Sequence, residues 1–202
     1  MPSNKDKIIA AAMELFHEQG FQATGLEEIL SRCGVVKSNF YYHFKSKEEL
    51  GRQVIQQKIA LMEEQIFGPS LDNRALGPKE RLGRLFRLMQ VSAEEHDCRR
   101  GCYIGNLVLE LGDRYEELRR LLVDFLEDIE NRIEACLQEG AANQEINLHG
   151  MKARETAVAL TALLQGGMLL GKAHRSSFAL QYGGKLVKHI IGNGSEGEQH
   201  AG

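Results

Sequence analysis

The sequence predicts an all-α fold, and three observations lead to this prediction. Apolar residues recur at the 3.6-residue spacing of amphipathic helices along most of the 202 residues. Only three prolines occur, Pro2, Pro69 and Pro78, so very few positions forbid a helix interior. No segment alternates apolar and polar residues as half-buried strands do. The expected architecture is an N-terminal three-helix helix-turn-helix domain and a helical C-terminal domain, with about nine helices in all.

Four helices are expected in the N-terminal third of the chain. Gly20 stands where a glycine commonly ends a helix, and Thr24 with Glu27 has the spacing of a capping box at the start of the next. Gly34 separates the two short helices of the helix-turn-helix layout. The apolar stripes and these end signals predict helices at about residues 5–19, 26–33, 37–43 and 46–67.

Five more helices are expected after Gly68-Pro69, which ends the fourth. Pro78 suits the first turn of the fifth helix. Residues 193–202 are low in hydrophobic residues and are expected to form a disordered tail. The predicted domains are 1–48, with the helix at 46–67 as a link, and 49–192. The predicted helices of the second domain lie at about 78–95, 101–111, 113–139, 152–173 and 178–191.

Composition excludes several classes of protein. Hydrophobic residues make up 43% and charged residues 26%, as in ordinary globular proteins, and a net charge of −3 rules out a uniformly basic coat. The four cysteines lack the spacing of a zinc site and no GxSxG or HExxH occurs, so we expect no metal, no cofactor and no enzyme activity. No apolar leader and no stretch of about 18 uncharged apolar residues occurs, which predicts a cytoplasmic protein without a membrane span.

Charge is distributed unevenly around the predicted helix-turn-helix. Residues 31–47 contain Arg32, Lys37, Lys45 and Lys47 but no acidic residue. Hydroxyl, amide and aromatic side chains lie among these cations, and this mixture suits contacts with phosphates and base edges. The residues alone leave an alternative open, in which a solvated basic turn belongs to a helical scaffold or partner-binding protein that does not bind DNA.

Two runs of residues carry a family signature: Thr24 with Leu26-Glu27-Glu28-Ile29-Leu30, and Gly34-Val35-Val36-Lys37-Ser38-Asn39-Phe40-Tyr41-Tyr42-His43-Phe44 continuing to Leu50. They resemble the DNA-binding signature of TetR-family transcriptional regulators, and residues 11–21 resemble the first helix of that family. The resemblance covers about residues 5–55. It implies a homodimer that binds a palindromic double-stranded DNA operator, commonly as a repressor, and is released when an inducer acts on the C-terminal effector and dimerisation domain.

The resemblance also implies roles for single residues. Those expected to touch phosphates are Thr24, which would also cap the second helix, Tyr41 and Lys47. Those expected to face the major groove and its rims are Lys37, Ser38, Asn39, Tyr42 and His43. Phe40 and Phe44 are interpreted as core residues that seat the recognition helix. Val36 departs from the family pattern, which usually has Ser or another small capping residue there, so the start of the recognition helix is left open.

Two glycines in the eighth predicted helix permit a close approach by another helix. Gly167 and Gly171 are four residues apart, so one helix face lacks side chains. Because glycine costs about 1 kcal/mol in a helix interior, a packing reason for the two glycines is expected. In the resembled family the last two long helices form the four-helix bundle of the dimer. We therefore expect the homodimer interface within about residues 152–191; the alternative is close packing inside one subunit.

Cys102 is a candidate sensor residue. It is expected in the first turn of the sixth helix, where the helix dipole and the neighbouring Arg99 and Arg100 favour a thiolate, with Cys98 as a candidate resolving partner. The alternative is that Cys102 is a small buried core residue. This helix start also resembles a subgroup of TetR-type repressors that control electrophile and N-ethylmaleimide reductase genes. In some of these the matching cysteine responds to electrophiles with a lysine near the end of the eighth helix as partner, and Lys172 is similarly placed.

A second hypothesis for the inducer is a hydrophobic small molecule bound non-covalently among the helices of residues 78–173. Apolar pockets with a few polar groups are the usual form of such sites. Each candidate residue could equally belong to the ordinary core. The candidates for the lining are Phe86, Met89, Tyr103, Leu107, Phe125 and Met168, with Asn106 or Gln165 as polar contacts.

Overall fold

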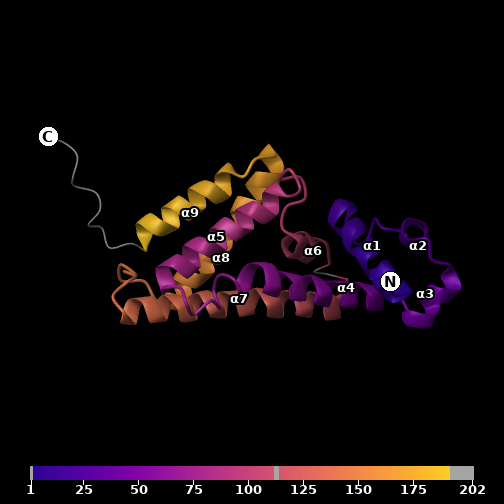
Figure 1. The fold of residues 1–202 in the computed structure, drawn as a ribbon, viewed down its shortest axis with the longest axis horizontal. Helices are drawn as coiled ribbons and strands as arrows, with labels where there is room; N and C mark the ends of the chain where they lie inside the picture. Colours follow the sequence, from indigo (N-terminus) through magenta and orange to yellow (C-terminus); the bar gives the residue numbers. More distant parts are fainter. Residues whose placement is uncertain (1, 112–113, 192–202) are drawn as a thin grey trace. The chain divides into compact units, whose positions relative to one another are not determined.

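The computed structural model describes residues 2–111 and 114–191, and these residues form nine α-helices and one short π-helix with no strand among them (Figure 1). The predicted all-α fold is confirmed. The predicted tail at 193–202 lies outside the described residues. The elements are α1 (Asn4–Gln19), α2 (Leu26–Cys33), α3 (Lys37–His43), α4 (Lys47–Met62), the π-helix η1 (Glu63–Phe67), α5 (Pro78–Glu94), α6 (Tyr103–Leu111), α7 (Glu116–Ala142), α8 (Ala153–His174) and α9 (Phe178–Ile190).

Two predicted helix bounds in the second half are wrong for identifiable reasons. α6 begins at Tyr103, so Cys102 precedes the helix instead of lying in its first turn. α7 continues through Gly140, which the sequence indicated as the end of the helix. A Cβ at Gly140 would clash with the side chain of Ile146, so this glycine permits a close approach of the following loop rather than ending the helix.

The fourth predicted helix does not continue as an α-helix to residue 67. At Glu63 it becomes the π-helix η1, and the Gly68 N–H donates to the Glu63 carbonyl at 2.8 Å, which closes a ring from residue i to residue i+5. A Cβ on Gly68 would lie only 2.9 Å from that carbonyl oxygen, so glycine fits this position best. Periodicity alone does not predict this change because η1 still buries Ile66 and Phe67.

The chain divides into two compact units, which are described separately. Of the described residues, those within 1–62 and 102–126 form the first unit, and those within 63–101 and 127–202 form the second. The first unit therefore includes α6 and the first part of α7 in addition to the helix-turn-helix. These units do not coincide with the predicted domains 1–48 and 49–192, since that boundary falls inside the continuous helix α4. The predicted division into a DNA-binding domain at 1–48 and an effector and dimerisation domain at 49–192 stays a prediction.

In the first unit, α1 packs against α2, α3 and α4 around an apolar core. Phe40 and Phe44 are 0% and 1% exposed, with ring centroids 5.3 Å apart, which confirms their interpretation as core residues. Because these two rings face inward, the opposite side of α3 is directed to solvent. The other large buried side chains of this core include Ile8, Leu15, Phe16, Phe21, Ile29, Leu50 and Val54.

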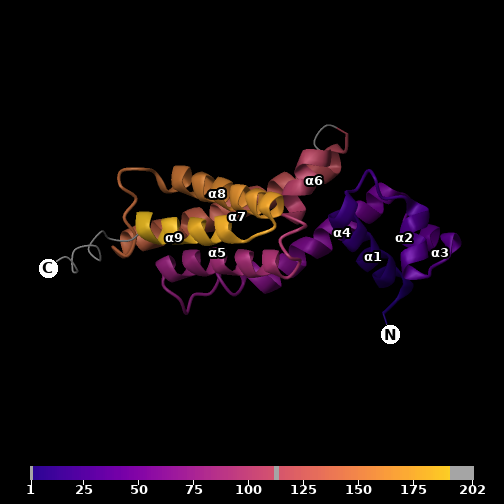
Figure 2. The same ribbon diagram turned by 90° about the horizontal axis from the view of Figure 1, so that it is seen from above.

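In the second unit, α9 packs against both α5 and α8, and Figure 2 shows the three helices alongside one another. A Cβ at Gly167 would lie 2.8 Å from Cδ2 of Leu180 on α9, and one at Gly171 would lie 3.3 Å from the Ser176 carbonyl oxygen. The chain's own α9 and the loop before it thus occupy the glycine face. The prediction that Gly167 and Gly171 face a second subunit is wrong, and the alternative of packing inside one subunit is correct for this face.

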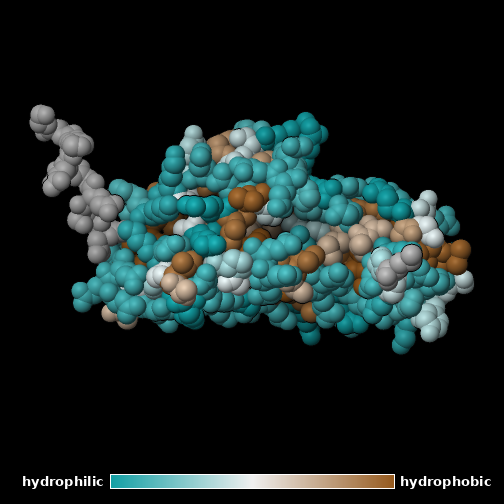
Figure 3. All heavy atoms as spheres, viewed as in Figure 1, coloured by the Kyte–Doolittle hydropathy of each residue, from teal (hydrophilic) through white to brown (hydrophobic). Residues whose placement is uncertain are grey.

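The solvent-facing side of α8 carries large apolar residues. By length and composition α8 could cross a membrane, but this is weak support for a span, because a buried helix of a helical bundle passes the same criteria. The face of the molecule in Figure 3 is mainly hydrophilic, with hydrophobic residues in separate patches. α8 exposes Val158, Leu169 and Leu170, which are 43%, 64% and 46% exposed.

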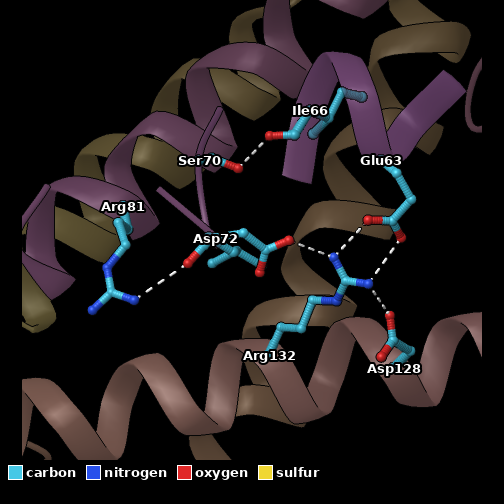
Figure 4. A network of polar contacts seen from close by, with 8 residues as sticks. Glu63, Ile66, Ser70, Asp72, Arg81, Asp128 and Arg132 are labelled. Carbon is cyan, nitrogen blue, oxygen red and sulfur yellow. Dashed lines mark hydrogen bonds and ion pairs between the residues drawn. The ribbon is translucent and has the colours of Figure 1, made fainter. Parts of the chain in front are cut away.

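A polar network ties η1 and the following loop to α7 in the second unit (Figure 4). The Arg132 guanidinium donates to both carboxylate oxygens of Glu63, at 2.6 and 3.0 Å, and to Asp72 at 2.8 Å. Asp128, one turn earlier on α7, lies 2.7 Å from the same guanidinium. Arg81, 1% exposed, donates to the Leu71 carbonyl at 3.3 Å and pairs with Glu139 at 2.6 Å. Both arginines fix the loop between η1 and α5.

Candidate DNA-binding surface and sensor residues

α3 presents polar and aromatic side chains on the side opposite its buried phenylalanines. Tyr41 and Tyr42 are 56% and 84% exposed, and Lys37 and Ser38 are exposed as well. Asn39 and His43 are half-buried, and the His43 ring lies edge-on to Tyr42, with 4.9 Å between the centroids. One short helix therefore offers ammonium, hydroxyl, amide and imidazole groups of the kinds that bind phosphates and base edges.

Val36 stands at the N-cap of α3. Its backbone is extended, with φ −79° and ψ 152°, and no side chain caps the first turn. The Val36 carbonyl accepts the N–H groups of Asn39 and Phe40 at 3.0 and 3.3 Å. The departure from the family pattern at this position therefore does not shift the helix, which begins at Lys37.

The capping role predicted for Thr24 is wrong. The N-cap of α2 is Gly25, with no side-chain hydrogen bond, and Thr24 is 0% exposed. The Thr24 hydroxyl donates to the Gly20 carbonyl at 2.6 Å and accepts a hydrogen bond from Gln19 at 3.4 Å. This local bond to the preceding turn replaces the capping box, because Ser and Thr hydroxyls bond nearby backbone groups readily. The buried Thr24 side chain has no access to a phosphate.

Lys47 begins α4 and is half-buried. Its Nζ lies 4.5 Å from the centroid of the Phe21 ring, a cation–π arrangement. Burial lowers the pKa of Lys47, and the negative charge of Glu110 opposes this effect. The predicted phosphate contact of Lys47 thus involves an ammonium group whose position depends on Phe21.

The basic segment at residues 31–47 is partly neutralised by its surroundings. Arg32 lies 3.6 Å from Glu18 on α1, and both side chains are largely exposed. Lys37 and Lys45 are exposed as well. The positive charge available to a polyanion is therefore carried mainly by Lys37, Lys45 and Lys47.

Cys102 lies directly before α6 in the position of a capping residue. Its carbonyl accepts the Asn106 N–H at 2.9 Å, and its Sγ accepts the Gly105 N–H at 3.4 Å. The sulfur thus lies at the first amides of the helix, in the place where capping side chains accept hydrogen bonds. The side chain is 7% exposed, so a reagent reaches it only when the site opens.

Cys98 is a poor candidate for a reactive thiol. It is 5% exposed and burial raises its pKa, with the charges of Glu94 and Asp97 acting in the same direction. Its backbone has φ +54°, an uncommon conformation for a residue other than glycine. Lys172 is exposed on the last turn of α8. The structure assigns Cys98 and Lys172 to the second unit and Cys102 to the first.

The residues predicted to line a pocket are divided between the two units. Tyr103, Asn106, Leu107 and Phe125 belong to the first unit, and Phe86, Met89, Gln165 and Met168 to the second. The apolar members are all buried in the described structure. Tyr103 has an unusual feature, because its hydroxyl is buried without a hydrogen-bond partner in the described structure, and burial raises its pKa. The predicted pocket itself is not tested by these observations.

Two functional candidates did not emerge from the sequence. Cys33, at the end of α2, is the half-buried cysteine, whereas Cys98, Cys102 and Cys136 are buried. Its Sγ donates to the Leu30 carbonyl at 3.6 Å. Glu110, on α6, holds the turn between α1 and α2 by backbone hydrogen bonds. No spacing rule connects residues 89 positions apart, so the sequence offered no signal for Glu110.

The helix-turn-helix with an exposed recognition helix is the architecture of a DNA-binding transcriptional regulator. Residues 8–54 match the family model of bacterial regulatory proteins of the tetR family. Residues 78–185 match the model of the tetracyclin repressor-like C-terminal domain, which alone covers more than half of the chain. The chain therefore belongs to the tetR family of transcriptional regulators.

Individual relatives agree with this assignment. The chain is 30% identical to the transcriptional regulator AcuR of Cereibacter sphaeroides over 140 residues, which are 69% of this chain and 64% of that relative. It is 25% identical to the transcriptional repressor NemR of Escherichia coli over 187 residues, 93% of each chain. The crystal structure of reduced E. coli NemR shares the fold, with a TM-score of 0.81 at 23% identity over 96% of this chain and 100% of that one. These relatives are regulators rather than enzymes.

Proposed function

We propose that this protein is a repressor that binds a palindromic operator as a homodimer, with α3 in the major groove. The exposed polar face of α3, carried on the buried Phe40 and Phe44, is the observation that supports this proposal most directly. The DNA contacts are made by the predicted residues other than the buried Thr24, which are Lys37, Ser38, Asn39, Tyr41, Tyr42, His43 and Lys47.

Dimerisation uses the outer faces of α8 and α9 within residues 152–191. Tyr182 and Leu186 on α9 are 59% and 47% exposed, and Leu169 on α8 is 64% exposed. Gly166, between the exposed positions of α8, would have no atom within 4 Å of an added Cβ, so a second helix has room to approach there. Apolar residues exposed along adjoining helices are typical of a surface that a partner covers. A two-fold dimer places two recognition helices about 34–36 Å apart on DNA.

The test is a gel-shift titration on a duplex that the wild-type protein selects from a random-sequence library. Tyr42→Ala and Lys37→Ala are expected to remain folded and to bind this duplex at least about tenfold more weakly, because each removes a base or phosphate contact. Lys79→Ala is the control, with the same loss of charge on α5. Unchanged affinity in both variants would contradict the proposal, and a wild-type protein without salt-dependent DNA binding would favour the alternative of a helical scaffold.

The inducer acts on Cys102. The Gly105 N–H donates to the Cys102 sulfur at the start of α6, and the crystal structure of a relative, E. coli NemR, is described as a reduced form. With N-ethylmaleimide as probe, the thiolate adds to the activated double bond, one S–C bond forms, and a proton from water completes the product. The bulky adduct is incompatible with the buried position of Cys102 and with its bond to Gly105.

Cys33 complicates this test because it is more accessible than Cys102 and lies in the helix-turn-helix. The comparison is therefore made in a Cys33→Ser background. There, N-ethylmaleimide is expected to release the selected duplex from the protein with Cys102 and not from the further variant Cys102→Ser. Equal release from both, or release from neither, would contradict the role of Cys102.

A non-covalent hydrophobic inducer is the second candidate, favoured by the unpartnered buried hydroxyl of Tyr103. Such a hydroxyl costs free energy unless a ligand or a water molecule accepts a hydrogen bond from it. A ligand of this kind releases DNA only if it binds the non-DNA-binding conformation more tightly. Tyr103→Phe would then lower the affinity for a polar-headed hydrophobic inducer and leave alkylation by N-ethylmaleimide unchanged.

A further inference from the structure

The turn between α1 and α2 is fastened by a side chain from a distant part of the sequence. The Glu110 carboxylate on α6 accepts the backbone N–H groups of Phe21 at 2.9 Å and Gln22 at 2.5 Å. The Gln22 side-chain N–H donates to the backbone carbonyl of Glu110 at 2.9 Å. The side-chain oxygen of Gln22 accepts a hydrogen bond from Arg114 at 3.1 Å. All of these residues belong to the first compact unit.

The turn is shaped to receive this carboxylate. Gly20 has φ +91°, and a Cβ there would lie 2.8 Å from Oε2 of Glu110. Glycine at this position therefore serves two purposes, since it accepts a left-handed backbone and leaves room for the carboxylate. Without Glu110, two adjacent amide groups just after α1 would lose a charged acceptor, and hydrogen bonds to charged groups are stronger than those between neutral groups.

The fastened turn positions a residue of the proposed DNA-binding surface. The Phe21 ring packs against Phe16 at 5.0 Å and Tyr115 at 5.2 Å between centroids, so its amide and its ring are both fixed. Lys47 Nζ lies over that ring at 4.5 Å. Through Phe21, the carboxylate on α6 thus determines where the ammonium group at the start of α4 lies.

We propose that Glu110 is a positioning residue for DNA binding, which holds Phe21 and hence Lys47 in the geometry required for a phosphate contact. This inference rests on the proposed DNA-binding function. α6 begins directly after the proposed sensor residue Cys102 and includes Glu110 in its last turn. If modification of Cys102 displaces α6, the hydrogen bonds of Glu110 would carry that displacement to the α1–α2 turn.

The sign of the effect separates positioning from simple charge. Removing an acidic residue from a protein normally strengthens its binding to DNA, because less negative charge opposes the phosphates. The proposal requires the opposite for Glu110→Ala, which is expected to bind the selected duplex at least about tenfold more weakly. Glu117→Ala, an exposed acid on the first turn of α7, is the matched control and is expected to bind as tightly as wild type or more tightly.

Two further measurements exclude a merely structural role. The slope of log affinity against log salt concentration is expected to fall by about 0.9 in Glu110→Ala, the amount for one lost phosphate contact. Hydrogen exchange is expected to accelerate at the amides of Phe21 and Gln22 in the turn after α1 and to stay unchanged in α1 itself. Glu110→Gln retains one acceptor oxygen and is expected to be intermediate in both measurements.

The outcomes are distinguishable from those of the proposed function. If wild type binds DNA selectively but folded Glu110→Ala and Glu110→Gln keep its affinity and salt slope, only the role of Glu110 is overturned. Exchange that rises throughout α1–α4 would likewise overturn it, because the residue would then support general stability. If wild type itself shows no selective binding, both proposals fail.

Discussion

At the scale of single residues, the four cysteines differ in access and in chemistry. Cys136 is 1% exposed, its thiol donates to the Pro78 carbonyl at 3.3 Å, and burial raises its pKa to about 11. Cys33 is half-buried at the end of a short helix. A single reagent therefore reports on different parts of the molecule, depending on which thiol reacts first.

Alkylation of the native protein with N-ethylmaleimide at neutral pH is expected to modify Cys33 first and Cys136 last. The thiolate is the reactive form, and Cys136 remains protonated and enclosed below pH values near 11. Peptide mass spectrometry at successive times checks the order. Modification of Cys136 before Cys33 in folded protein would show that α7 opens more readily than α2.

The same pKa predicts a dependence of stability on pH. The unfolded thiol has a value near 9.0, and the folded thiol has a higher one, so the protonated form is favoured by folding. The stabilisation is complete below pH 9 and is lost as the pH rises towards about 11. The free energy of unfolding, measured in urea, is therefore expected to fall more between pH 9 and about 11 for wild type than for Cys136→Ala. If both proteins lost stability equally between these pH values, the raised pKa of Cys136 would be contradicted.

At the scale of elements, α8 has two faces with different requirements. Gly167 contacts Leu180 of α9, whereas an added Cβ at the adjacent Gly166 would meet no atom within 4 Å. Gly167→Ala is expected to lower stability by about 1–3 kcal/mol through overpacking. Gly166→Ala is expected to lower stability less than Gly167→Ala, because no atom of the same subunit lies within 4 Å of the added Cβ and alanine has the higher helix propensity. Thermal unfolding of the two variants compares them, and equal losses would contradict this description of α8.

The link between η1 and α7 depends on one guanidinium. Arg132→Ala leaves the carboxylates of Glu63, Asp72 and Asp128 close together without their cation, which is expected to cost about 1.5–3 kcal/mol because the network is partly exposed. Arg120, 71% exposed and paired with Glu116 on the surface, is the control, and its replacement by alanine is expected to cost under about 1 kcal/mol. Urea unfolding measures both, and similar costs would show that the network contributes no more than a surface ion pair.

At the scale of the whole molecule, the uncovered apolar faces of α8 and α9 determine the proposed assembly. Leu169→Glu combined with Leu170→Glu is expected to give a monomer that binds the selected duplex weakly, because charged residues would be buried against a second copy. Leu109→Glu is the control, since Leu109 is 86% exposed on α6 in the other unit. Sedimentation measures the mass, and a dimer that persists in the double variant would contradict the interface.

The sequence predicted local features better than long-range ones. The helices, the exposed face of α3 and the buried Phe40 and Phe44 all follow from periodicity and a family signature within about 20 residues. The face of α8 that Gly167 occupies was assigned to the wrong partner, because spacing shows that a close approach is possible but not which helix makes it. The contacts of Glu110 could not be predicted from the sequence, because its partners are backbone N–H groups, which nearly every residue type has. Thr24 was misassigned because a capping box and a bond to the preceding turn use the same hydroxyl.

The π-helix η1 has a consequence for how this chain can change length. Its ring from Glu63 to Gly68 holds one residue more than an α-helical turn. Deleting one residue among 63–67 would restore α-helical bonding and remove the need for glycine at 68. Deleting Gln57 from α4 would instead rotate every following side chain of that helix by about 100° away from its partners. In an alignment of family members, we therefore expect that relatives one residue shorter in this region have their gap at η1 and have another residue in place of Gly68.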